Sequence, residues 1–443
     1  MENWQEASAA DLGRAVAAGL DPRELVERFL DAIADHPDQA LIYARVTPER
    51  ARSEAATAHE RQRSGVLAGP LDGVPISWKD NVDTEGVATE AGSRLLAGRV
   101  PNADAPALTR ATEAGLVCLG KTHLSELAFS GLGFNPMMAT PPNAADRRRV
   151  PGGSSSGAAV SVAKGLAAAG IGSDTGGSVR IPAAWNGLVG LKTTIGAISC
   201  EGIVPLSVSF DTPGPLTRTV EDAALLFDAM RGVTTALPEA GLPARLLLPE
   251  THVMDDLDPA VAEAFGVAIS ALSAAGVTIT RAEVPELAES AALLSERGGV
   301  LGTEVWDQWG PTIEANPEMM YHQIEARFRG NAGFTAEDAA YSRGEQARLA
   351  RALCARIEEH GMLVMPTSPT LPPLIARLLA DDAYYTAVNL LALRNTRQGN
   401  LLGLSSLTLP TAAPMVGVML MAPPGGEPDL IRAGRAMEGI LAS

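Results

Sequence analysis

The stretch that most constrains this chain runs from Gly152 to Arg180 and reads GGSSSGAAVSVAKGLAAAGIGSDTGGSVR. It holds two glycine-flanked serine clusters, around Ser154 and Ser178, joined by a small-residue helix pattern and a short apolar run. Glycine beside a hydroxyl permits positive φ and close approach to the backbone, and such a turn can aim N–H groups at an anion. Flexible Ser/Gly linkers share this composition, but they do not enclose an apolar helix and strand. We therefore interpret the stretch as a structured site.

Composition and charge point to a globular protein with a small-molecule partner. Of the 443 residues, 46% are apolar and 20% are charged, which is ordinary for such a protein. With 35 basic against 52 acidic residues the net charge is −17, so we expect the surface to repel nucleic acid and anionic membranes. The N-terminus lacks a signal-peptide pattern and no run of 18 apolar residues occurs. We expect a cytoplasmic protein.

The metal-ligating residue types are scattered along the chain. The cysteines are Cys118, Cys200 and Cys354, and the histidines are His36, His59, His123, His252, His322 and His360. The cysteine spacing favours reduced thiols over disulfides, and the histidines show no zinc-ligand spacing. We therefore expect neither a metal site nor a cofactor.

The pattern of elements predicts an α/β fold. Ser8 and Asp21-Pro22 resemble helix starts. Residues 70–83 predict a turn and a short strand, and residues 246–279 alternate strand, helix and strand, which favours parallel pairing. Residues 287–360 look mostly helical. Returning strands are expected at 363–365, 407–409 and 416–421, and a last helix at 429–441. No linker divides the chain, so we expect a single domain with a large mixed sheet wrapped by helices.

A phosphate-binding motif occurs at Gly115–Thr122, GLVCLGKT, which matches G-x-x-x-x-G-K-[ST]. That motif needs a loop across its variable positions, so that backbone N–H groups face the phosphates. Here the variable positions are an apolar run typical of a strand. We therefore interpret this match as fortuitous.

A serine nucleophile needs a base, and the chain offers several candidates. Histidine is the commonest base, but His123 has no serine-elbow context. A lysine kept neutral by burial is the alternative, and Lys79 is the leading candidate. Asp80 and Asp83 lie close to it in sequence, and a nearby carboxylate would hold it protonated. Strand alternation places Asp80 on the opposite face, whereas the position of Asp83 stays open.

A second serine–lysine pair, Ser161 and Lys164, forms an S-x-x-K pattern. On a helix the two side chains would be neighbours. The surrounding stretch is alanine-rich, and so short a pattern arises by chance. We therefore expect catalysis to survive loss of Ser161 and to fail on loss of Ser178.

With these residues placed, the chain resembles the amidase signature family over nearly its whole length. The matching segments are long and ordered, which makes the resemblance far more specific than any short motif. They are 73–81 (GVPISWKDN), 120–122 with 125–131 (GKT, SELAFSG), 151–157 (PGGSSSG), 172–183 (GSDTGGSVRIPA), 187–192 (GLVGLK) and 209–216 (SFDTPGPL), with later echoes at 365–367 and 423–426.

The resemblance implies a Ser-Ser-Lys triad. In it Ser178 is the nucleophile, Ser154 the bridging hydroxyl and Lys79 the neutral base, and the Gly153–Ser154 peptide bond is cis. Backbone N–H groups of four residues would form the oxyanion hole, namely Thr175, Gly176, Gly177 and Ser178.

The resemblance also implies a substrate site. Ala128, Phe129 and Ser130 match the segment that lines the acyl pocket. Arg180 either pairs with Asp174 to brace the loop or binds a substrate carboxylate, and both alternatives stay open.

Two regions depart from the family pattern. His123 stands where similar proteins usually carry asparagine. Residues 287–360 carry no clear signature, and their aromatic and arginine residues either shape the pocket or face solvent. We expect each of them, taken alone, to face solvent. Those residues are Trp306, Trp309, Tyr321, His322, Arg327 and Arg329.

We expect one amidase domain over 1–443, with N-terminal helices (1–60), signature core (61–240), variable substrate-shaping region (241–360) and returning strands with the last helix (361–443).

The sequence therefore predicts an amidohydrolase that cleaves the C–N bond of a small carboxamide through an acyl-enzyme on Ser178. The nearest alternative is the glutaminase component, or A subunit, of a glutamyl-tRNA(Gln) amidotransferase, although residues 209–216 look more like stand-alone amidases. An alternative of another class is a catalytically silent binding protein on the same fold. The oligomeric state stays open, with a homodimer among the states considered.

Overall fold

A mixed sheet of eleven strands is the centre of the computed structural model, which describes residues 3–443. The strand order is β1-β3-β2-β4-β6-β5-β10-β11-β9-β7-β8. The strands are β1 (Tyr43–Val46), β2 (Pro75–Lys79), β3 (Val117–Thr122), β4 (Ala169–Asp174), β5 (Val189–Lys192), β6 (Thr212–Thr217), β7 (Arg245–Pro249), β8 (Thr278–Ala282), β9 (Met362–Pro366), β10 (Ser405–Pro410) and β11 (Gly417–Ala422). The predicted mixed sheet is confirmed.

Two groups of parallel strands flank an antiparallel middle, and the edge strand β1 pairs antiparallel with β3. Strand β2 pairs in parallel with β3 and β4, and β7 pairs in parallel with β8 and β9. The pairs from β4 through β6, β5, β10 and β11 to β9 are antiparallel. Helix α9 (Pro259–Ala274) connects β7 to β8 and is capped by Asp258. The predicted crossover is therefore confirmed.

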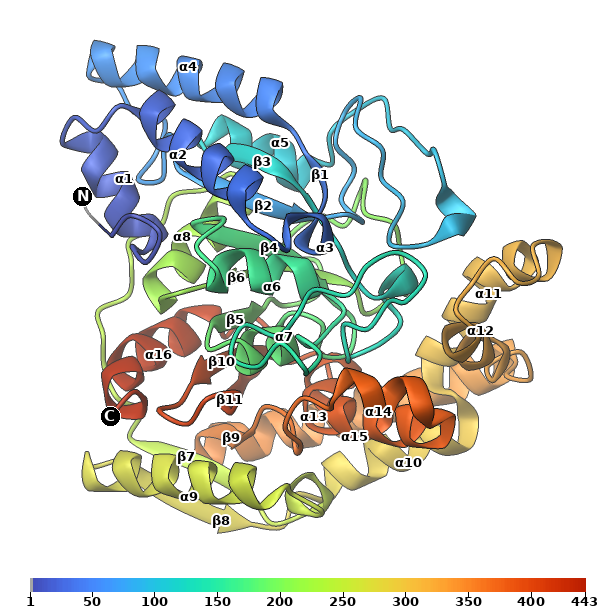
Figure 1. Ribbon diagram of the computed structural model, residues 1–443. Helices are drawn as coiled ribbons and strands as arrows, with labels where there is room; N and C mark the ends of the chain where they lie inside the picture. Colours follow the sequence, from blue (N-terminus) through green and yellow to red (C-terminus); the bar gives the residue numbers. More distant parts are fainter. Residues whose placement is uncertain (1–2) are drawn as a thin grey trace.

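Helices flank the sheet. They are α1 (Ala9–Ala17), α2 (Pro22–Asp35), α3 (Gln39–Ile42), α4 (Pro48–Ser64), α5 (Pro106–Glu113), α6 (Ser156–Ala163), α7 (Arg180–Trp185), α8 (Val220–Arg231), α10 (Pro285–Arg297), α11 (Gly299–Ala315), α12 (His322–Arg329), α13 (Ala336–His360), α14 (Ile375–Ala380), α15 (Asp382–Leu401) and α16 (Glu427–Leu441). Figure 1 shows α4 at one edge of the molecule, α9 at the opposite edge, and α11 and α12 on the side away from both termini.

Side-chain caps begin the first two helices where the sequence predicts them. Ser8 accepts a hydrogen bond from the N–H of Asp11, and Asp21 accepts one from the N–H of Arg23. The helical prediction for residues 287–360 is also confirmed, by α10 to α13.

The match to the phosphate-binding motif lies inside a strand. Strand β3 continues through Gly120, Lys121 and Thr122, so these residues form no phosphate-binding loop. The Lys121 ammonium is buried and lies 3.2 Å from the carboxylate of Asp80. The geometry agrees with the interpretation of this motif as fortuitous.

One hydrophobic cluster positions the site. It packs the 124–134 loop, α7, α11, α12 and α15 together, beside the larger core of the sheet. Phe129, Leu206, Leu301 and Leu393 belong to this cluster. Side chains from these elements therefore meet next to the end of β4.

No helix within residues 3–443 is long and apolar enough to cross a membrane.

Candidate active site

Lys79 is the last residue of β2, and its side chain is fully buried. Its Nζ lies 2.7 Å from Ser154 Oγ and 2.8 Å from Ser173 Oγ, and it also donates to the Ser173 carbonyl at 3.2 Å. Asn81 donates to Ser173 Oγ at 3.0 Å. These contacts fix the amine against Ser154. Ser173 and Asn81 belong to the site but were not among the predicted residues.

The aspartates close to Lys79 in sequence point elsewhere. Asp80 contacts Lys121 and Arg45, at 3.2 and 3.3 Å. The strand ends before Asp83, whose carboxylate forms two hydrogen bonds with Arg99, at 2.6 and 2.8 Å. Neither carboxylate contacts Lys79.

Burial dominates the electrostatics of Lys79. It lowers the pKa of the amine to about 7, while the charges of Asp211 and Asp174 act in the opposite direction. Desolvation disfavours the charged form of a buried lysine. A substantial fraction of Lys79 is therefore neutral near pH 7, as a base requires.

The two serines lie on adjoining turns. Ser154 follows a cis peptide bond from Gly153, as the resemblance implies, and just precedes α6. The N–H of Ser155 donates to the carbonyl of Ser178 at 3.1 Å, which ties the two serine clusters together. Ser154 is fully buried, and Ser178 is 4% exposed. Among the contacts within residues 3–443, no hydrogen bond joins the Ser178 and Ser154 hydroxyls.

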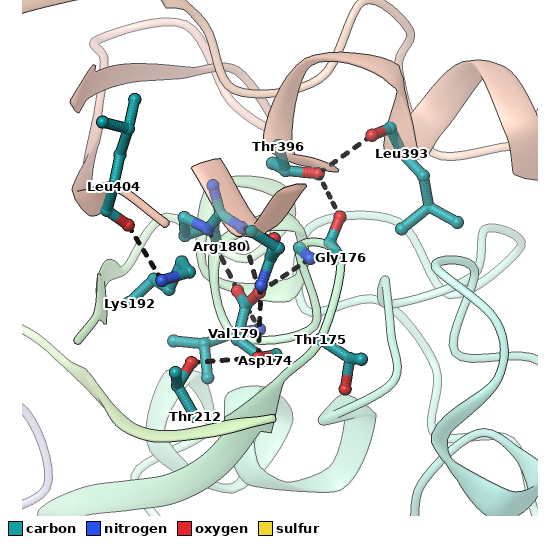
Figure 2. Close-up of polar contacts among 12 residues, drawn as sticks. Asp174, Thr175, Gly176, Val179, Arg180, Lys192, Thr212, Leu393, Thr396 and Leu404 are labelled. Atoms are coloured by element: carbon teal, nitrogen blue, oxygen red, sulfur yellow. Dashed lines mark hydrogen bonds and ion pairs between the residues drawn. The ribbon is translucent and has the colours of Figure 1, made fainter. Parts of the chain in front are cut away.

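Asp174 organises the turn that carries Ser178 (Figure 2). Its carboxylate accepts hydrogen bonds from the N–H groups of Gly177 and Val179, at 2.8 and 3.1 Å. Two nitrogens of Arg180 donate to it at 2.9 and 3.0 Å, and the Asn400 amide donates at 2.9 Å. Arg180 is fully buried. The geometry favours the bracing alternative for Arg180 over contact with a substrate carboxylate.

The donor set of the expected oxyanion hole is narrower than the sequence suggests. The N–H of Gly177 is directed to Asp174, so it is not free for a substrate oxygen. Within the described part of the chain, the N–H groups of Thr175, Gly176 and Ser178 donate to no other residue. Thr396 donates its hydroxyl to the Gly176 carbonyl at 2.7 Å, which holds the turn from the other side (Figure 2).

A small cavity opens beside Ser178. Six of the predicted site residues line it, namely Ala128, Phe129, Ser130, Thr175, Gly176 and Ser178. Ser130 is fixed from behind, because its hydroxyl donates to Asn389 at 3.1 Å and lies 3.3 Å from the Tyr385 hydroxyl. Arg180 and Gly177 do not line the cavity.

Five further residues line the same cavity and were not among the predicted site residues: Leu206, Leu301, Arg327, Leu393 and Arg397. The expectation that the residues of 287–360 face solvent is wrong for Arg327, Trp309 and Tyr321, which pack into the hydrophobic cluster or the cavity wall. One sequence feature could have indicated that α15 belongs to the site. Polar residues recur there at helical spacing, and all of them are buried, namely Asn389, Thr396 and Asn400.

The other candidate bases lie apart from the serines. Lys164 donates to the Ala144 carbonyl, whereas Ser161 lies 2.8 Å from the hydroxyl of Ser77. Burial lowers the pKa of His123 to about 4. No hydrogen bond within residues 3–443 joins the His123 ring to Ser154 or Ser178.

Comparisons with known proteins identify the family of the chain. The Amidase family description matches residues 24–431. The chain is 35% identical to 2-amino-5-chloromuconic acid deaminase of Comamonas testosteroni, over 96% of this chain and 95% of that protein. It is 33% identical to the A subunit of the glutamyl-tRNA(Gln) amidotransferase of Chloroflexus aggregans, over 96% and 94% of the two chains. A crystal structure of an amidase superposes with a TM-score of 0.88 at 29% identity, covering 98% of this chain and 100% of that one. The chain therefore belongs to the amidase family of amide-hydrolysing enzymes.

Proposed function

We propose that the protein hydrolyses the C–N bond of a small carboxamide through an acyl-enzyme on Ser178, releasing ammonia or an amine. The observation that carries the proposal is the buried Lys79 amine, 2.7 Å from Ser154 Oγ, beside the turn of Ser178. A buried, neutral lysine is a base that can activate a serine hydroxyl.

In the first half-reaction Ser178 Oγ forms a bond to the amide carbon. Its proton passes to Ser154 Oγ as the Ser154 proton passes to Lys79 Nζ. A hydroxyl rotation completes this relay, because catalytic hydrogen bonds often close only when substrate is bound. The carbonyl electrons move onto oxygen, where the N–H groups of Thr175, Gly176 and Ser178 would each contribute about 3 kcal/mol.

In the second half the tetrahedral intermediate collapses and the C–N bond breaks. The leaving nitrogen takes the proton from Lys79 through Ser154. Water then adds to the acyl carbon and gives its proton to the same relay. Collapse of this second intermediate breaks the bond to Ser178 and releases the carboxylic acid. The Ser178 oxygen takes the proton back from Lys79 through Ser154, which restores the resting enzyme.

A labelling experiment tests the proposal. We expect a fluorophosphonate probe to label folded wild-type protein at Ser178, and Ser178→Ala to lose both labelling and amide hydrolysis. Lys79→Ala should lose most of the rate. Ser161→Ala is the matched control, since that buried serine lies outside the cavity. If folded wild-type protein is not labelled and hydrolyses no amide, the chain is a silent binding protein instead.

A second candidate function is the glutaminase component of an amidotransferase. The 33% identity to a protein of that name favours it, whereas the relative named as a deaminase of a small acid favours a stand-alone enzyme. Purification of the chain from its native host separates the two. A co-purifying partner on which glutaminase activity depends would replace our proposal, and activity of the chain alone would support it.

A further inference from the structure

Two arginines from different helices line the cavity that contains Ser178. Arg327 comes from α12 and Arg397 from α15. No acidic side chain of the described residues lines this cavity with them. The cavity thus holds two cationic groups, one nucleophilic hydroxyl and apolar walls.

Arg397 has no partner for its charge among residues 3–443. Its guanidinium forms no ion pair or side-chain hydrogen bond there, and Nη2 is buried without an acceptor. Leaving a buried charged donor unsatisfied costs more than leaving a neutral one. Such a guanidinium group is retained where a molecule bound in the cavity supplies the acceptor.

Arg327 is held in place but is also not neutralised. Its Nη1 donates to the Phe129 carbonyl at 2.8 Å, and its guanidinium lies 4.1 Å from the centre of the Phe129 ring. Within the described chain it forms no ion pair. Backbone and ring contacts orient the guanidinium and leave its other nitrogens without a carboxylate. The guanidinium is therefore preorganised to bind an anion.

Both guanidinium groups stay charged at neutral pH, although their surroundings lower both pKa values. Burial lowers the pKa of Arg327 to about 9, with a further contribution from the charge of Arg397, and burial lowers the pKa of Arg397 to about 10. Two neighbouring cations in an apolar cavity repel each other. An anion placed between the two guanidinium groups would offset their repulsion and would supply the acceptor that Arg397 lacks.

We propose that the substrate is a small amide that carries a carboxylate, and that Arg327 and Arg397 bind this carboxylate while Ser178 attacks the amide. A carboxylate matches the planar guanidinium fork. The cavity beside Ser178 is small, which restricts the molecule to a short chain. This inference rests on the proposed function, because it assumes that the amide reacts at Ser178. Arg180, whose guanidinium is already bound by Asp174, is not part of this subsite.

Isosteric pairs of amides test the inference. Succinamate carries the carboxylate on the acyl side, and 4-methylpentanamide is its neutral isostere. N-acetylglycine carries it on the amine side, and N-isobutylacetamide is its neutral isostere. We expect wild-type kcat/KM to favour the charged member of one pair by about 100-fold or more. The pair that shows the preference identifies the side that bears the carboxylate.

Variants locate the preference. Arg397→Met and Arg327→Met should each lower kcat/KM for the preferred acid by about 10- to 100-fold and lower kcat/KM for the neutral isostere much less. Arg394→Met and Arg329→Met are the matched controls, since they lie on the same two helices outside the cavity. Equal rates for both members of each pair in the wild type, or equal losses on charged and neutral amides, would overturn the inference.

A binding measurement separates failure of this inference from failure of the proposed function. We expect succinate or N-acetylglycine, titrated calorimetrically into Ser178→Ala protein, to bind, and the added Arg397→Met change to weaken binding at least tenfold. Amide turnover without such binding overturns the carboxylate site alone. Binding without labelling of Ser178 or turnover of any amide overturns the proposed function and keeps the anion site.

Discussion

The protonation state of Lys79 decides whether the site can accept a proton. Its pKa is lowered to about 7 by burial, so below that pH the amine is protonated and cannot act as a base. We expect kcat/KM to fall about tenfold per pH unit on the acidic side. The measurement is a pH–rate profile between about pH 5 and pH 9, with unfolding monitored in parallel.

Asp211 provides the control for this assignment. Its charge raises the pKa of Lys79, so Asp211→Asn should move the acidic limb to lower pH. An unchanged limb, or one that moves upward, would assign the limb to a different group.

The backbone conformation of Gly177 constrains the turn of Ser178. Its φ is +135°, and a Cβ at this position would lie 2.1 Å from the Thr396 hydroxyl oxygen, which holds the Gly176 carbonyl. We expect Gly177→Ala to displace the oxyanion donors and lower kcat by about 100-fold. Gly266→Ala, in a helix with open space around it, should leave kcat unchanged. Equal kcat for both variants would contradict this role.

At the level of elements, the loop 205–211 contributes Leu206 to the cavity wall, and Val208 in the same loop is 77% exposed. Helix α11 holds this loop through Glu304, which accepts hydrogen bonds from the Ser207 hydroxyl and the Ser209 N–H. Hydrogen bonds to a charged group contribute about 1.5–3 kcal/mol each. We expect Glu304→Ala to loosen the loop, raising KM more than it lowers kcat.

Steady-state kinetics and limited proteolysis of the loop measure this effect. Asp307→Ala is the control, since that exposed residue lies on the same helix and does not bond to the loop. An unchanged KM together with unchanged cleavage at residues 205–210 would show that Glu304 does not secure the wall.

For the whole molecule, Arg180 joins distant parts of the chain. It binds Asp174 at the end of β4, Asn400 of α15 at 2.6 Å and the sulfur of Met419 in β11 at 3.4 Å. Removing one partner of a fully buried ion pair costs about 3–5 kcal/mol. We expect Arg180→Ala to lower the free energy of unfolding by about this amount, measured by urea denaturation.

An exposed ion pair supplies the comparison. Arg148 pairs with Asp146, but its side chain is 80% exposed, and solvent screens such pairs. Arg148→Ala should leave the unfolding midpoint unchanged. Equal losses in the two variants would mean that burial is not what makes the Arg180 contact important.

The features that depend on local pattern could be predicted from the sequence. The strand before Lys79, the capped helices and the glycines around Ser154 and Ser178 all follow from short-range rules. Arg397 could not be found this way, because its place in the cavity depends on the packing of α15 beside the Ser178 turn, which lies far earlier in the chain. The same holds for Asp211 and Lys79, whose proximity arises from strand pairing. The N–H groups of the turn that are free could not be predicted from the sequence either, because the Gly177 N–H meets the Asp174 carboxylate only once the turn has folded.

The proposed catalytic residues and the proposed carboxylate-binding residues come from different parts of the strand order. Lys79, Ser154 and Ser178 all precede α7, around the neighbouring strands β2 and β4. Arg327 lies in the excursion between β8 and β9, and Arg397 in the one between β9 and β10. Strand β9 is paired on both sides, with β7 and β11, so these excursions can change in length and composition without altering the register of the sheet. Under the proposed function, mutations in these excursions would therefore change the substrate preference while Lys79, Ser154 and Ser178 stay in place.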